Sequence, residues 1–178
     1  MKVLVTGGTG YIGSHICVEL IQAGHEVIVI DDFSNSKPEV LGYIKDITGK
    51  EVKFYEFNIL DEKKTEEVFK ENDLDAVIHC AAFKAVGESV EKPIEYYTNN
   101  LTTTLIVAKM MKKYHVNNIV FSSTNTLASF VSKSIAPRSS LVFCKISASS
   151  FIKKNKSHTW LYSSCSFLSP ASILLTLL

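Results

Sequence analysis

Residues 3–13, VLVTGGTGYIG, decide the fold of this chain. Apolar residues that favour β-structure are followed by glycines at positions 7, 8, 10 and 13, and an amphipathic segment begins near Tyr11. This order predicts a strand, a tight glycine turn and the start of a helix. Glycines let a backbone approach a pyrophosphate closely, and a helix N terminus presents N–H groups and a positive dipole end to it. The segment therefore predicts a nucleotide-binding turn; the alternative is a structural turn that merely needs glycine.

Strand and helix patterns alternate along the chain as far as residue 124. Short apolar runs rich in β-branched residues predict strands, and apolar residues at helical spacing predict helices. The predicted strands are 3–5, Glu26–Asp31, Val52–Phe57, Asp75–His79 and Asn118–Ser123, and the predicted helices are 11–22, Pro38–Ile47, Glu62–Glu71 and Pro93–Tyr114. Ser36 and Asp61 are the expected N-caps of the second and third helices, and Gly24 is the expected C-cap of the first. Such alternation specifies an α/β fold with a Rossmann-type doubly wound parallel sheet, here incomplete with five strands.

Candidate binding residues fall at the carboxyl ends of the predicted strands, where ligands bind in such sheets. Asp31 lies 18 residues beyond Gly13, where a carboxylate can accept hydrogen bonds from both hydroxyls of an adenosine ribose. A carboxylate at this position repels a 2′-phosphate, which favours NAD over NADP. Residues 58–59, 80–84 and 122–124 follow or end three further strands. Each alone is compatible with an ordinary loop, but their convergence on one edge favours a cofactor site.

The overall composition is that of one globular domain. The 178 residues are 46% hydrophobic and 21% charged, and the formal net charge of +1 does not favour nucleic acid as a partner. The chain starts directly with the first predicted strand, so we expect no signal peptide and a cytoplasmic location. Cysteines at positions 17, 80, 144 and 165 lack metal-site spacing. We expect reduced structural thiols and no metal site.

The composition changes abruptly after residue 124. All 18 acidic residues lie between Glu19 and Glu95, and all 8 glycines lie at or before Gly87. Residues 1–124 have a net charge of −5, whereas residues 125–178 contain no acid and have a net charge of +6. A stretch of ordinary composition would contain several acids. We therefore predict a nucleotide-binding domain over 1–124 and an atypical tail over 125–178 that is irregular or poorly folded.

Three segments carry a more specific resemblance. They are TGGTGYIGSH (6–15), DDFSNS (31–36) and FKAVGESVEKPIEYYTNN (83–100). The glycines at 7, 10 and 13 have the spacing typical of the short-chain dehydrogenase superfamily, and the three segments together closely resemble the N-terminal half of the UDP-glucose 4-epimerases, which are extended members of that superfamily. The third segment is the discriminating one, because many sugar-nucleotide enzymes share the glycine turn. The resemblance covers residues 1 to about 124 without a gap.

The resemblance implies a role for each candidate residue. Residues 11–12 would lie on the pyrophosphate, residues 31–36 would hold the adenosine ribose, and residues 58–59 would flank the adenine. Residues 80–84 and Asn99 would line the cofactor. The implied cofactor-binding set is Gly7, Gly10, Tyr11, Ile12, Gly13, Asp31, Asp32, Phe33, Ser34, Asn35, Ser36, Asn58, Ile59, Cys80, Ala81, Ala82, Phe83, Lys84 and Asn99. The family also implies NAD as cofactor, a UDP-sugar substrate and a homodimer.

The chemistry of the family is a hydride cycle. Bound NAD⁺ takes hydride from C4 of the sugar, the 4-keto intermediate turns, and hydride returns to the opposite face. In relatives the tyrosine of a Tyr-x-x-x-Lys motif is the base, and the resemblance implies that Thr124 hydrogen-bonds the sugar 4-hydroxyl. None of the seven tyrosines here has Lys four residues later. An ungapped count puts Ser149 and Lys153 at the two motif positions, and we attribute the lysine match to chance.

One hypothesis explains both the missing motif and the acid-free tail. Residues from about 125 onward would be translated out of frame, and sequencing the coding DNA tests this, because a single-nucleotide shift after codon 124 must then restore a Tyr-x-x-x-Lys frame. The rival interpretation is a membrane anchor, since residues 160–178 are uncharged and follow lysines at 153, 154 and 156. Five serines and Pro170 within that span weaken the anchor interpretation.

Two functions therefore stay open from the sequence. The first is an NAD-dependent UDP-glucose 4-epimerase by descent, in a truncated and impaired copy. The second is a non-catalytic Rossmann fragment that binds NAD. A five-stranded sheet would also leave the apolar fifth strand as an unpaired edge, from which we expect aggregation.

Overall fold

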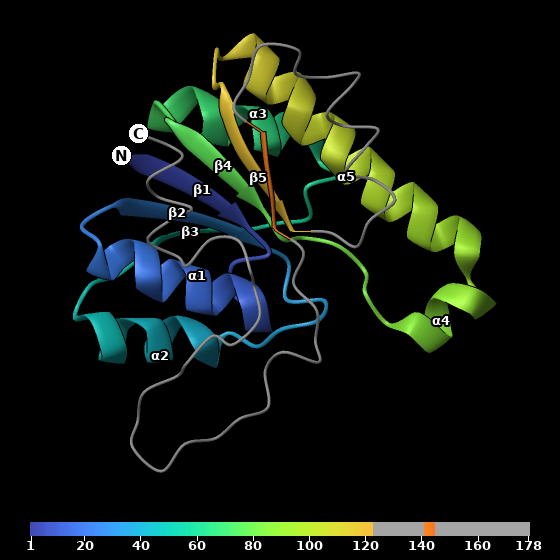
Figure 1. Cartoon of the computed structure of the whole chain (residues 1–178), viewed down its shortest axis with the longest axis horizontal. Helices are drawn as coiled ribbons and strands as arrows, with labels where there is room; N and C mark the ends of the chain where they lie inside the picture. The colour runs from blue at the N-terminus through green and yellow to red at the C-terminus, as the bar shows by residue number, and fades with distance from the viewer. Residues whose placement is uncertain (123–140, 145–178) are drawn as a thin grey trace.

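A parallel sheet forms the centre of the molecule (Figure 1). The structure, a computed structural model, describes residues 1–122 and 141–144. Its strands are β1 (Lys2–Thr6), β2 (Glu26–Asp31), β3 (Lys53–Glu56), β4 (Ala76–His79), β5 (Asn118–Ser122) and β6 (Leu141–Cys144). They lie in the order β3-β2-β1-β4-β5-β6, and neighbouring strands are parallel. The predicted Rossmann-type α/β fold is confirmed.

Helices cover both faces of this sheet. The helices of the described residues are α1 (Tyr11–Gln22), α2 (Glu39–Thr48), α3 (Glu62–Asn72), α4 (Val86–Glu91) and α5 (Pro93–Lys113). α1 and α2 lie on one face and α3 and α5 on the other, while α4 and the start of α5 extend beyond the sheet (Figure 1). The chain winds outward from β1 in both directions, so the topological switch point, where such folds bind ligands, lies between β1 and β4.

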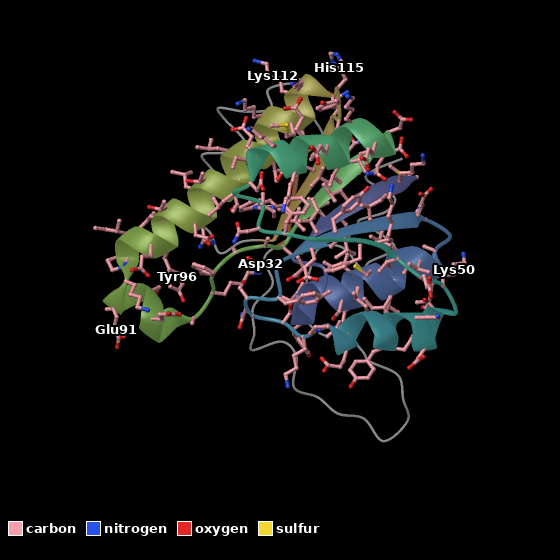
Figure 2. The ribbon with its side chains drawn as sticks, turned by 180° about the vertical axis from the view of Figure 1, so that it is seen from behind. Asp32, Lys50, Glu91, Tyr96, Lys112 and His115 are labelled. Carbon is pink, nitrogen blue, oxygen red and sulfur yellow. The ribbon has the colours of Figure 1, made fainter. Side chains whose placement is uncertain are left out.

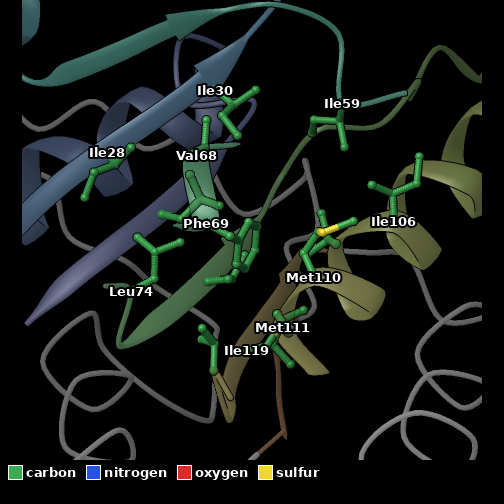
Figure 3. Close-up of a cluster of buried hydrophobic side chains, with 14 residues drawn as sticks. Ile28, Ile30, Ile59, Val68, Phe69, Leu74, Ile106, Met110, Met111 and Ile119 are labelled. Atoms are coloured by element: carbon green, nitrogen blue, oxygen red, sulfur yellow. The ribbon is translucent and has the colours of Figure 1, made fainter. Parts of the chain in front are cut away.

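The core consists of two apolar layers, one on each face of the sheet. Successive side chains of a strand point to opposite faces, so a strand that is covered on both faces is apolar throughout. Figure 3 shows the layer against α3 and α5, where Ile28 and Ile119 of the sheet pack with Phe69 and Met110 of the helices. The opposite faces of the strands pack against α1 and α2. The rigid sheet between these layers positions the loops that follow its strands.

Within residues 1–122 and 141–144 the sheet has six strands, where the sequence analysis predicted five. β6 is a four-residue run of apolar β-formers that pairs with β5, from Ile119 opposite Leu141 to Ser122 opposite Cys144. The composition of residues 125–178, taken as a whole, conceals so short a strand, and pairing with β5 decides its conformation. The edge of β5 is therefore paired, and the expectation of an open edge there is wrong.

The predicted bounds of the strands and helices within residues 1–122 agree with the structure to within one residue, but two predicted caps do not. α2 is capped by Pro38 instead of Ser36, whose hydroxyl binds the carboxylate at the end of β2. The C-cap of α1 is Ala23 instead of the predicted Gly24, which follows Ala23 with a φ of 86°. Asp61 is the N-cap of α3 as predicted, because its side chain accepts a hydrogen bond from the N–H of Lys64, the third residue of the helix. The short helix α4 adds an element that the sequence analysis did not contain.

Of the predicted tail, residues 125–178, the structure describes only residues 141–144. Within residues 1–122 and 141–144, no helix has the length and apolar character that a membrane span requires. The proposed anchor segment 160–178 lies outside the described residues. The same holds for Thr124, Ser149 and Lys153.

Candidate cofactor-binding site

The register of the sheet brings the ends of three strands to one edge. Thr6 at the end of β1 lies opposite Ile30 of β2 and His79 of β4. The ladders continue one residue further, because the Gly7 N–H donates to the Ile30 carbonyl (2.8 Å) and the Cys80 N–H donates to the Thr6 carbonyl (3.0 Å). The loops after β1, β2 and β4 therefore begin side by side.

The glycine turn packs directly against the loop after β4. Gly7 has a φ of 68°, and a Cβ at this position would lie 2.8 Å from the Ala81 nitrogen. α1 then begins at Tyr11 with Gly10 as N-cap, and glycine has no side chain with which to cap the first turn. Positive partial charge at this helix N terminus is therefore available to an anion that enters the cleft.

Asp31 joins the glycine turn to the loop after β2. Its Oδ2 accepts a hydrogen bond from the Thr9 N–H (3.0 Å), and its Oδ1 accepts from the Phe33 N–H and the Ser36 hydroxyl (both 3.0 Å). The Thr9 and Ser36 hydroxyl oxygens lie 2.7 Å apart. A carboxylate has about four acceptor positions, so these three bonds hold Asp31 in place and leave capacity for a ligand hydroxyl.

A second polar contact joins the loops after β2 and β3. The Asn58 side-chain amide donates to Asp32 Oδ2 (2.6 Å), and Asn58 Oδ1 accepts from the Leu60 N–H (2.9 Å). Burial acts to raise the pKa of Asp32, but hydrogen bonds from Ser34 and Asn58 outweigh it and hold the pKa below its usual value. Figure 2 shows Asp32 where the strands end, between α5 and the helices α1 and α2.

One cleft at this edge contains nearly all the residues that the sequence analysis singled out. Every predicted cofactor-binding residue except Phe33 lines it. Phe33 adopts a left-handed backbone conformation (φ 56°), and its ring packs against that of Phe54, with 5.1 Å between the ring centroids. Its backbone N–H nevertheless holds Asp31. Phe33 therefore contributes to the cleft through its backbone, which holds Asp31 in place, and not through its side chain.

Three residues line the cleft that the sequence analysis missed, namely Ile30, Phe57 and Thr103. Ile30 and Phe57 each precede a predicted residue directly. Thr103 lies one helical turn after Asn99, and its hydroxyl donates to the Asn99 carbonyl (2.9 Å). Helical spacing from Asn99 is the signal that could have identified Thr103.

Two cysteines of the described region, Cys17 and Cys80, are buried in the core, where the sequence analysis expected structural thiols. Burial raises the pKa of the Cys17 thiol far above its ordinary value. Among the described side chains, no group of three or more His, Cys, Asp or Glu residues is placed to hold a metal ion.

The sheet order, the glycine turn and the acidic end of β2 define a Rossmann-type protein of the dinucleotide-binding class. The model of the NAD dependent epimerase/dehydratase family matches residues 3–145, and the chain belongs to this family. It is 55% identical over 127 residues to UDP-glucose 4-epimerase from Bacillus subtilis. That alignment covers 71% of this chain and 38% of the relative, so the chain spans well under half of the relative's length.

Solved structures agree with this family. The UDP-glucose 4-epimerase from Bifidobacterium longum, in complex with NAD⁺ and UDP, is 52% identical with a TM-score of 0.69, and the match covers 70% of this chain and 37% of that one. The UDP-Glc/GlcNAc 4-epimerase from Campylobacter jejuni is 27% identical with a TM-score of 0.66, and the match covers 98% of this chain and 46% of that one. The predicted resemblance to UDP-glucose 4-epimerases is confirmed.

Proposed function

We propose that this chain contains the NAD-binding part of a UDP-glucose 4-epimerase and that it binds NAD in the cleft at the carboxyl edge of the sheet. The observation that carries the proposal is the convergence of the glycine turn, Asp31 and residues 80–84 on that cleft. The relatives from Bifidobacterium longum and Stenotrophomonas maltophilia have NAD bound in their crystal structures.

The elements around the cleft suggest how the two halves of NAD would lie. The pyrophosphate would meet the N terminus of α1, where N–H groups and the helix dipole favour negative charge. The adenosine half would extend over β2 and β3, with its ribose at Asp31 and its adenine near Asn58 and Ile59. The nicotinamide half would then extend over β4, along residues 80–84 and Asn99.

Catalysis by this chain alone is a separate question. Bound NAD supplies the hydride acceptor, and a UDP-sugar would be the substrate, but the reaction also needs a base for the 4-hydroxyl. No tyrosine in the 178 residues is followed by Lys at the fourth position. We propose that the chain as it stands binds NAD without epimerising UDP-sugars. In a protein that also has the catalytic tyrosine, we propose that the residue at the position of Thr124 hydrogen-bonds the 4-hydroxyl of the sugar.

Isothermal titration of the full chain with NAD tests the cofactor proposal. Asp31→Ala should weaken NAD binding by about tenfold, because hydrogen bonds to a charged group are lost. Asp46→Ala, which removes the same charge from an exposed position on α2, serves as the matched control. A wild-type chain that does not bind NAD would contradict the proposal.

The catalytic proposal needs its own measurement. The chain is incubated with UDP-galactose and NAD⁺, and UDP-glucose is quantified by chromatography. We expect none above the background of a reaction without protein. Appreciable turnover would show that another residue replaces the missing tyrosine.

We further propose that the chain is cytoplasmic and that it forms a homodimer, the latter as its resemblance to the family implies. The projecting part of α4 and α5, where Figure 2 labels Glu91 and Tyr96, carries large exposed apolar side chains. Ile94 is 80% exposed and Tyr97 is 68% exposed, and they lie three residues apart on one face of α5. Light scattering should give the mass of a dimer, and Ile94→Asp should shift it to that of a monomer.

A further inference from the structure

Residues 80–85, which connect β4 to α4, are held by two side chains that do not line the cleft. Near the start of this connection, the Ala81 N–H donates to Thr6 Oγ1 (3.4 Å). Further along, the Phe83 N–H donates to Asn100 Oδ1 (2.8 Å), and Asn100 Nδ2 donates back to the Phe83 carbonyl (3.1 Å). Asn100 therefore satisfies both backbone groups of a residue that lines the cleft, although it does not line the cleft itself.

His79 joins these two anchors through the core. Its ring is only 2% exposed, and it is stacked on Phe121 with 5.3 Å between the ring centroids. Its Nδ1 lies 2.7 Å from Thr6 Oγ1, and its Nε2 lies 3.3 Å from Thr104 Oγ1. The Thr104 hydroxyl in turn donates to the Asn100 carbonyl (2.7 Å).

The direction of each hydrogen bond in this network follows from which atoms can donate and which can only accept. The Thr104 hydroxyl uses its hydrogen on the Asn100 carbonyl, so its oxygen accepts from the Nε2–H of His79. The Nδ1 of that neutral imidazole is then an acceptor, and it accepts from the Thr6 hydroxyl. Thr6 Oγ1 accepts from Ala81. The hydroxyls of Thr6 and Thr104 and both ring nitrogens of His79 therefore have hydrogen-bond partners, and a buried polar network that is satisfied in this way is rigid.

We infer that Asn100 is a positioning residue for the β4 side of the cofactor cleft, and that Thr6, His79 and Thr104 fix the backbone on which it acts. The inference rests on the proposed NAD function. Asn100 controls where residues 80–84 lie, whereas the glycine turn and Asp31 are held by their own contacts. Removing its side chain therefore disturbs the half of the cleft assigned to nicotinamide and leaves the adenosine half unchanged.

The difference between NAD and AMP isolates this effect. Both nucleotides use the adenosine half of the cleft, but only NAD extends along residues 80–84. Asn100→Ala should weaken NAD binding by about tenfold, since two hydrogen bonds that fix the segment are lost, and should leave AMP binding unchanged. Thr98→Ala, at an exposed position on the same helix, should change neither affinity.

Each contrary result has a distinct meaning. Unchanged NAD binding in Asn100→Ala would overturn the positioning role, and an equal loss of NAD and AMP would overturn it in favour of general damage to the fold. Wild-type protein that binds neither nucleotide would contradict the proposed function. Hydrogen exchange without nucleotide tests the positioning role independently: the Phe83 amide should exchange about tenfold faster in Asn100→Ala, and an unchanged rate would contradict the inference.

Discussion

A Cβ built on Gly13 would lie 2.1 Å from the carbonyl oxygen of Gly7. The first turn of α1 therefore approaches the glycine turn at a distance that only glycine permits. Gly42 is also helical, on α2, but a Cβ there would meet nothing within 4 Å. The two positions form a matched pair for testing the packing of the turn.

Alanine should have opposite effects at these two positions. Gly13→Ala should lower the free energy of unfolding by about 1–3 kcal/mol, because the backbone must move to admit the methyl group. Gly42→Ala should raise it by about 0.5–1 kcal/mol, because alanine loses less backbone entropy in a helix. Urea unfolding measures both, and a similar change in the two variants would contradict the close approach.

Asp31 should determine the choice between NAD and NADP. The wild-type chain should bind NAD at least about tenfold more tightly than NADP, because the carboxylate repels a 2′-phosphate. Asp31→Ala should bring the ratio of the affinity for NAD to the affinity for NADP closer to one. Ser36→Ala removes a hydrogen bond to the same carboxylate but keeps its charge, so the preference should persist while the affinity for NAD falls modestly. Titrations of each variant with both nucleotides give the ratio, and an unchanged ratio in Asp31→Ala would disprove the role.

The pair formed by Asn58 and Asp32 should show a dependence on pH when Asn58 is replaced by Asp. The two carboxylates would then face each other where an amide now donates a hydrogen bond over 2.6 Å. At pH 7 Asn58→Asp should be less stable than the wild type, because Asp32 loses an amide donor and gains a like charge while the bond from the Leu60 N–H is kept. The difference should shrink as the pH falls and one carboxyl takes up a proton. Urea unfolding at pH 7 and pH 5 tests this, and equal stabilities at pH 7 would contradict it.

His79 should make the fold sensitive to acid. Burial and the charge of Lys84 lower its pKa from 6.5 to about 4. Because the unfolded chain binds a proton more readily than the folded one, the stability contributed by neutral His79 is present above pH 6.5 and is lost as the pH falls towards 4. The full loss is about 3 kcal/mol.

The slope of stability against pH isolates the contribution of His79. In His79→Gln the free energy of unfolding should vary less between pH 6.5 and 4 than in wild type, whatever its absolute value. Burial and the N-terminal charge also lower the pKa of His25, so His25→Gln is the control for a second titrating group. An unchanged slope in His79→Gln would show that the ring titrates normally.

Much of the candidate site could be predicted because its signals are local. The spacing of Gly7, Gly10 and Gly13, and the acid at the end of β2, can be recognised without knowing any contact. Parallel topology then places the ends of β1, β2 and β4 together, which is why separate segments of the sequence line one cleft. Phe33 is the exception, because a left-handed backbone turns its side chain onto Phe54.

The sequence by itself determined the order of strands and helices up to residue 122 apart from the short helix α4, and also the glycine turn and the family, because these depend on short-range periodicity and on residue types at set spacings. Two features were decided by the tertiary structure alone, because they depend on partners distant in the sequence. Leu141–Cys144 joins the sheet as β6, and the Asn100 side chain forms hydrogen bonds with the backbone of Phe83. The boundary near residue 124 stays a prediction, and both β6 and the family match to residue 145 extend beyond it. Long-range pairing gives a short segment its conformation, and no local pattern records that pairing.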